Sequence, residues 1–164
     1  MKPVELIEAK RKHLARLANQ SGASGELAII ESMEHWLPRP KGAGIKVLLQ
    51  TLKEAGISIK PSSFDAISFP GAQDIDFTNA SVVAALLPSM VFIEIKTSNQ
   101  ERVKPDFTGF FFALTESEIS AAEALGNRHK VAMYNKRTGE LWLTSVPEIL
   151  ARAKSTNWQV SVQL

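Results

Sequence analysis

Residues 91–97, Val-Phe-Ile-Glu-Ile-Lys-Thr, limit the possible folds of this chain more than any other stretch, because two charges interrupt an apolar run. A short run of this composition predicts a buried strand. Side chains two positions apart in a strand point to the same face, so Glu94 and Lys96 are expected to project together. Burying both charges is costly unless they pair, bind a metal ion or take part in a reaction. The plainer interpretation is a strand at a sheet edge with one solvated Glu–Lys pair.

The composition is that of an ordinary globular protein. The chain has 164 residues, 45% hydrophobic and 22% charged, so we expect a single domain over residues 1–164. There is no run of about 18 apolar residues and no apolar segment near the start, so we expect neither a membrane span nor a secretory signal. The absence of cysteine excludes disulfides, thiolate metal sites and a cysteine nucleophile, and it fits a cytoplasmic protein.

Helical patterns fill the first third of the chain. Apolar residues recur at helical spacing in three segments, residues 3–19, 25–36 and 45–55. Ser24 is expected to cap the second helix, and Gly56 to end the third. The chain is therefore expected to consist of N-terminal helices, residues 1–56, and a sheet core, residues 57–164.

In the sheet core, strands are expected to alternate with helices. The strand candidates are residues 57–59, 64–69, 91–97, 129–135, 141–146 and 158–164. Residues 109–114 form a further apolar run that we expect to be buried. Thr115 and Glu118 form a capping box, which predicts the start of a helix that ends near Gly126. Residues 81–87 fit either a short helix or a strand.

This order of elements resembles the core of the PD-(D/E)XK nuclease superfamily, and an Asp…Glu-x-Lys pattern strengthens the resemblance. The pattern consists of Asp65 in Phe-Asp-Ala-Ile and of Glu94 and Lys96 in Phe-Ile-Glu-Ile-Lys-Thr. Glu26, on an early helix, is similar to the additional Glu that many resolvase-like and restriction-like members carry there. The resemblance implies an α/β fold with a restriction-endonuclease-like mixed central sheet flanked by helices.

The resemblance also implies a function, that of a Mg²⁺-dependent DNA endonuclease. Asp65, Glu94 and the carbonyl of Ile95 are then expected to hold the metal ion, and Mn²⁺ is expected to substitute for Mg²⁺. Lys96 is expected to orient or help deprotonate the attacking water, and Glu26 to act as an outer ligand. DNA is the expected partner, with RNA and a homodimer left open.

The choice of the metal-binding aspartate stays open in the sequence. Asp74 and Asp76 also alternate with apolar residues, and they precede Glu94 by 20 and 18 residues, against 29 for Asp65. The shorter spacings are more usual for a hairpin partner. Asp65 is favoured because it lies in a cleaner strand pattern, bounded by proline on both sides.

The charge distribution is compatible with two classes of function. Residues 1–60 hold ten basic against six acidic residues, whereas residues 61–100 hold one lysine against four acidic residues. An acidic centre with basic flanks suits a metal site for a polyanion, although the net charge of +2 is too small to indicate nucleic-acid binding by itself. The alternative to a nuclease is a non-catalytic DNA-binding or assembly module with the same fold. The complete set of Asp65, Glu94 and Lys96 favours the enzyme.

Overall fold

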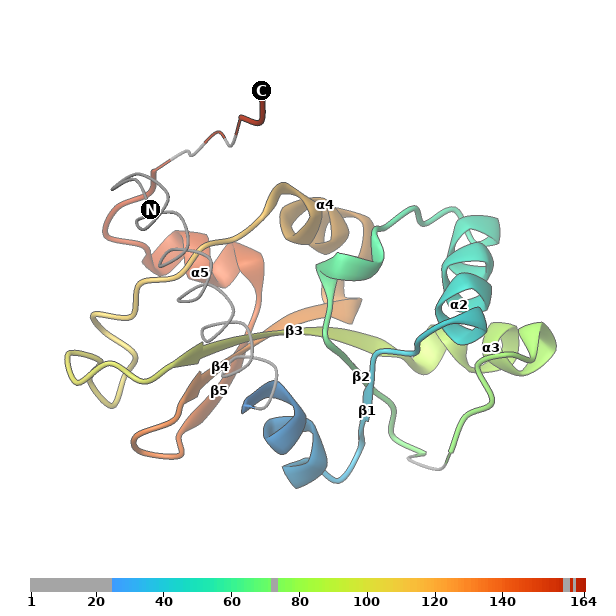
Figure 1. Cartoon of the computed structure of the whole chain (residues 1–164), viewed down its shortest axis with the longest axis horizontal. Helices are drawn as coiled ribbons and strands as arrows, with labels where there is room; N and C mark the ends of the chain where they lie inside the picture. Colours follow the sequence, from blue (N-terminus) through green and yellow to red (C-terminus); the bar gives the residue numbers. More distant parts are fainter. Residues whose placement is uncertain (1–24, 72–73, 158–159, 161) are drawn as a thin grey trace, which may run out of the picture.

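The computed structural model describes residues 25–71, 74–157, 160 and 162–164. One five-stranded sheet forms the centre of the molecule, and helices pack on both of its faces (Figure 1). The fold is therefore α/β, with a mixed sheet flanked by helices. The helix expected over residues 3–19 lies outside the described residues. Within the described part of the chain, no helix is long and apolar enough to cross a membrane.

The strands lie side by side in chain order: β1 (Trp36–Pro38), β2 (Ala66–Ser68), β3 (Val91–Ser98), β4 (His129–Asn135) and β5 (Leu141–Thr144). Neighbouring strands pair antiparallel, except that β3 and β4 run parallel. A parallel pair needs a crossover connection, and helix α4 (Glu116–Leu125) lies in that connection. The charged strand β3 is therefore the central strand of the sheet and not an edge strand.

The remaining helices are the first helix (residues 25–32), α2 (Ala43–Glu54), α3 (Ala80–Leu86) and α5 (Val146–Arg152). Local signals define where several of them begin and end. Gly56 has a φ of 85° and ends α2 in a Schellman motif, in which the N–H of Ile57 donates to the carbonyl of Leu52 at 2.9 Å. Thr115 and Glu118 form the predicted capping box at the start of α4.

The two faces of β3 pack against different helices. Ile93 and Ile95 lie in a core cluster with residues of the first helix, whereas Phe92 lies in a cluster with residues of α2, α3 and α4. Burying each of these side chains contributes about 1.5–3 kcal/mol, which fixes the register of the strand. Because side chains alternate along a strand, Glu94 and Lys96 share the face of Phe92, which α4 covers.

Two expectations about the N-terminal half are wrong. The helix expected over residues 25–36 ends at residue 32 and Trp36 begins β1, so the sheet starts inside the segment 1–56, where only helices were expected. Pro38 explains this difference, because proline disfavours helical conformation in the residue before it but is tolerated in an edge strand. No strand forms at residues 57–59, because the N–H of Ile57 is used to close α2.

The expected burial of residues 109–114 is also wrong. The segment is a loop in which Phe110 and Phe112 are partly buried, while the side chain of Phe111 is 75% exposed. A consecutive apolar run sends side chains in different directions, and the core lies on one side only. The ambiguous residues 81–87 belong largely to helix α3. The strand expected at the C-terminus is absent from the part of that segment that the structure describes.

Candidate active site

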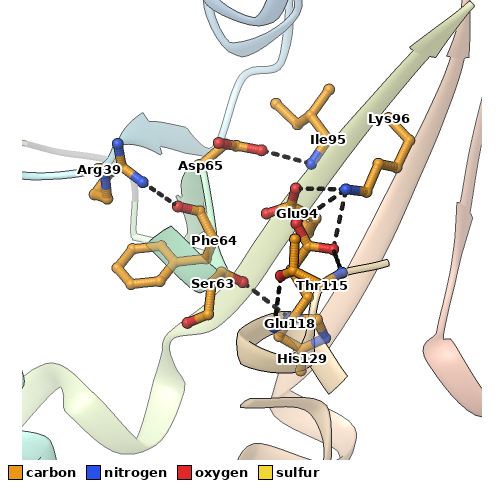
Figure 2. A network of polar contacts seen from close by, with 10 residues as sticks. All are labelled: Arg39, Ser63, Phe64, Asp65, Glu94, Ile95, Lys96, Thr115, Glu118 and His129. Atoms are coloured by element: carbon orange, nitrogen blue, oxygen red, sulfur yellow. Dashed lines mark hydrogen bonds and ion pairs between the residues drawn. The ribbon is translucent and has the colours of Figure 1, made fainter. Parts of the chain in front are cut away.

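The Glu94–Lys96 pair lies in the interior of the protein. Lys96 Nζ is 3.1 Å from Glu94 Oε1, and the side chains of Lys96 and Glu94 are 15% and 7% exposed. Both side chains project from the central strand toward α4 (Figure 2). The plainer interpretation, a solvated pair at a sheet edge, is therefore wrong.

Asp65 immediately precedes β2 and lies beside β3. Its N–H donates to the carbonyl of Ile93, and its carboxylate accepts a hydrogen bond from the N–H of Ile95, both at 2.8 Å (Figure 2). The N–H and C=O of a strand residue point to the same side, so the Ile95 carbonyl also faces the side on which Asp65 lies. The pairing of β2 with β3 begins at Ala66. The Asp65 carboxylate therefore lies beside β3, just before the first residue of β2.

Arg39 holds the segment that carries Asp65. Its guanidinium donates to the carbonyls of Pro61 and Phe64 at 2.8 and 2.9 Å, and its backbone N–H donates to the carbonyl of Asp65 at 3.0 Å. These three bonds fix the chain where it enters β2. Burial raises the pKa of Asp65, although the N–H of Ile95 and the positive charge of Arg39 act in the opposite direction.

Glu118 is a member of the site that the sequence analysis missed. Its two carboxylate oxygens accept from Lys96 Nζ at 2.9 and 3.0 Å, and Oε2 also accepts from the N–H of Thr115 at 2.9 Å. The side chain of Glu118 is only 6% exposed. The capping box indicates where Glu118 lies in its helix, but no local signal indicates a contact with a strand residue 22 positions away.

The carboxyl group of Glu94 is strongly perturbed. Burial, followed by the negative charge of Asp65, raises the pKa of Glu94 to about 9, while Lys96 acts to lower it. Glu94 Oε2 is buried and has no hydrogen-bond partner among the described residues. Buried polar atoms in folded proteins rarely lack a partner. This oxygen is therefore free to take up a proton or to contact a cation.

Glu26 approaches from the first helix, which covers the opposite face of β3 from α4. Burial, followed by the charge of Asp65, raises the pKa of Glu26 to about 7, while neighbouring basic groups lower it. One of these is Lys136, whose side chain lies directly over Gly25. Glu26 thus shares the electrostatic environment of Asp65.

Asp74 and Asp76, the alternatives to Asp65, are exposed in the loop before α3. Asp76 accepts hydrogen bonds from the N–H and the hydroxyl of Thr78, which lower the pKa of its carboxyl group. It therefore stabilises a local turn. Of the three aspartates, Asp65 is the one whose charge raises the pKa of Glu94. Helix α3 lies between β2 and β3 in the sequence, and this accounts for the long spacing between Asp65 and Glu94.

The donor atoms of this cluster fit Mg²⁺ or Mn²⁺. Asp65, Glu94 and the carbonyl of Ile95 offer oxygen ligands, which these cations prefer. Mg²⁺ is commonly held by one or two carboxylates and keeps several waters. No group of three or more His, Asp or Glu side chains in the described ranges is arranged to hold an ion by itself. A metal ion here would therefore depend on two carboxylates, a backbone carbonyl and water.

Comparisons with models of protein families, with curated proteins and with solved structures each gave no match. The class of the protein therefore follows from its own fold and geometry. It is an α/β protein in which two carboxylates contact one largely buried lysine of the central strand.

Proposed function

We propose that this protein is a Mg²⁺-dependent phosphodiesterase, a DNA endonuclease of the PD-(D/E)XK type. The observation that carries the proposal is the meeting of Asp65, Glu94 and Lys96 on and beside one central strand. A purely structural Glu94–Lys96 pair does not explain why a second carboxylate, that of Asp65, lies beside it and accepts a hydrogen bond from Ile95. It also does not explain why one oxygen of Glu94 has no partner among the described residues. A metal ion bound at both carboxylates would contact the free oxygen of Glu94 and offset the repulsion between Asp65 and Glu94.

The order of the elements supports the same proposal. A helix precedes three antiparallel strands, between which α2 and α3 are inserted in the sequence, and a crossover helix then leads to a strand parallel to the third. A restriction-endonuclease-like core is expected to have this order, with Glu94 and Lys96 on its third strand. Glu26 then lies on the first helix, at the position implied for the additional acidic residue.

Each residue has a distinct role in the proposed reaction. Asp65, Glu94 and the Ile95 carbonyl would hold the metal ion, which when bound would neutralise phosphate charge and lower the pKa of a coordinated water. Lys96 places a positive charge beside Glu94, where it stabilises the negative charge that develops on the phosphate in the transition state. Glu26 accepts a hydrogen bond from an outer water and so orients it.

The test is cleavage of supercoiled plasmid, of single-stranded and branched DNA and of RNA, each with Mg²⁺, Mn²⁺ or EDTA. We expect cleavage of DNA only with a divalent ion. Glu94→Gln and Asp65→Asn should lose cleavage, because each removes a charged ligand. Asp74→Asn is the matched control, since it removes a carboxylate from an exposed loop. It should cleave at the wild-type rate.

Two outcomes would overturn the proposal. DNA binding that weakens with added salt, without cleavage of any substrate, would favour the non-catalytic module instead. Cleavage that persists unchanged in Glu94→Gln would show that the activity does not arise at this site.

A further inference from the structure

The ammonium group of Lys96 lies between two carboxylates that come from different elements. Lys96 Nζ is 3.1 Å from Glu94 Oε1 and 2.9 and 3.0 Å from the two oxygens of Glu118. An ammonium group has three donor hydrogens, and these oxygens can accept all of them. Because lysine has a long, flexible side chain, the position of this charge is set by its partners.

Glu118 is itself held in place at the start of α4. Its Oε2 accepts from the N–H of Thr115 at 2.9 Å, and its own N–H donates to Thr115 Oγ1 at 3.2 Å. Further along the helix, Ala121 and Leu125 are buried in the core cluster that also contains Phe92 of β3. The carboxylate therefore reaches the central strand from a helix that is anchored both at its cap and along its buried face.

The helix cap alone does not explain why residue 118 carries a charge. The cap needs one acceptor for the N–H of Thr115, and glutamine can supply it as well as glutamate. A carboxylate that is 6% exposed costs more to bury than an amide does. The contact with Lys96 is the interaction that specifically uses the negative charge.

We propose that Glu118 is a positioning residue, which holds the Lys96 ammonium group beside Glu94 and on the face where the proposed reaction takes place. The effect on rate rests on the proposed nuclease function, whereas the contact can be tested without any activity. Glu118 acts only through Lys96 and is not one of the proposed metal ligands. Its loss should therefore slow the reaction while the thermal stabilisation of the protein by Mn²⁺ persists.

The kinetic experiment compares Glu118→Ala, Glu118→Gln and Thr115→Ala with the wild type under single-turnover conditions with Mg²⁺. We expect Glu118→Ala to slow cleavage by about 10- to 100-fold, the usual cost of losing a group that orients a metal-site residue, with little change in DNA affinity. Glu118→Gln should be intermediate, because it keeps an acceptor oxygen. Thr115→Ala removes the hydroxyl of the helix cap but keeps the backbone N–H that donates to Glu118 Oε2. The Lys96 contact should therefore persist, and cleavage should stay near the wild-type rate.

A double variant shows whether Glu118 acts through Lys96. In a Lys96→Ala background, Glu118→Ala should cause no further loss of rate, because the group that it positions is already missing. A full additional loss in this background would overturn the inference, since Glu118 would then act independently. Circular dichroism and melting curves of each variant confirm that the proteins compared are folded.

Chemical acetylation of the metal-free protein, read by peptide mass spectrometry, tests the contact itself. Lys96 should react several-fold faster in Glu118→Ala than in the wild type or in Thr115→Ala. The exposed Lys53 should react equally in all three and serves as the internal control. Unchanged reactivity of Lys96 would overturn the inference. The expected labelling in a protein that cleaves no substrate would support the positioning of Lys96 and overturn the nuclease function.

Discussion

The pKa values of acidic side chains shift in opposite directions in two parts of this protein. In the cluster around β3, burial raises the pKa of both Asp65 and Glu94. In the loop before α3, hydrogen bonds from Thr78 lower the pKa of the exposed Asp76. The loop carboxylate stabilises a turn, whereas the buried carboxylates are held at a cost to folding. The comparison shows that burial beside a basic partner, and not the spacing of acidic residues along the chain, distinguishes the candidate site.

The largest contrast is expected when the buried and the exposed lysine are each removed. Lys96→Ala should slow cleavage by about 10²-fold or more, because it removes a charge that acts on the transition state. Lys53→Ala, on the exposed side of α2, should stay near the wild-type rate. Single-turnover cleavage and DNA affinity are measured together at a temperature where both variants are folded. A loss of affinity as large as the loss of rate would contradict the role assigned to Lys96.

The second contrast concerns the metal ion. Mn²⁺ at 100 times its Kd should raise the free energy of unfolding by about 2.7 kcal/mol, because the unfolded chain lacks the site. Glu94→Gln should abolish this stabilisation, and Asp76→Asn should retain it. Thermal melting with Mn²⁺ or EDTA provides the measurement. A wild-type melting curve that does not respond to Mn²⁺ would count against any metal site in the buried cluster.

A smaller effect is expected in the metal-free protein. Asp65→Asn keeps an oxygen that can accept from Ile95 and removes a charge beside Glu94. It should therefore stabilise the metal-free protein, because burial disfavours the charged form of Asp65. Asp74→Asn should leave the free energy of unfolding unchanged within about 0.5 kcal/mol, as for most surface substitutions. Urea unfolding in EDTA compares the two. Destabilisation by Asp65→Asn would mean that this charge supports the fold and not a ligand.

The smallest expected effect concerns a buried histidine near the site. Burial lowers the pKa of His129 below its ordinary value of 6.5, despite a contact of Nε2 with the Ser63 carbonyl at 3.3 Å. Below pH 6.5 the unfolded chain therefore binds a proton more readily than the folded protein does, and stability falls as the pH falls. His129→Gln should reduce this slope by at most about 1.4 kcal/mol per pH unit.

The exposed His35 provides the control for this last measurement. Urea unfolding of His129→Gln and His35→Gln is compared at pH values just above and below 6.5, the ordinary histidine value. Only the slope is compared, because substitution of a core residue changes stability at every pH. An equal slope in both variants would show that His129 does not contribute to the pH dependence.

Much of the sheet core can be predicted because its signals are local. The apolar run of β3 and the capping box of α4 each define an element within a few residues. Strand alternation also predicts that Glu94 and Lys96 share a face, and their 3.1 Å contact confirms it. The three-residue strand β1 was missed because it is too short to show a pattern and follows directly after a helical one.

The rest of the site depends on packing between distant segments. The contact of Glu118 with Lys96 requires α4 to lie over the face of β3 that carries both charges. Arg39 contacts residues 22 and 25 positions away, and no local pattern indicates this. That Asp65, and not Asp74 or Asp76, lies beside β3 likewise depends on which segment pairs with β3, a long-range property.

Helix α4 is both the crossover between the two parallel strands and the source of Glu118, and this has a consequence for folding. The hydrogen bonds that pair β1, β2 and β3 involve only residues that precede α4 in the chain. The Lys96–Glu118 contact needs the following loop to close, and closure of long loops slows folding. A chain emerging from the ribosome would thus carry Glu94 and Lys96 before their full surroundings exist. The proposed nuclease activity would then arise only after the crossover has docked, so an incomplete chain would be inactive.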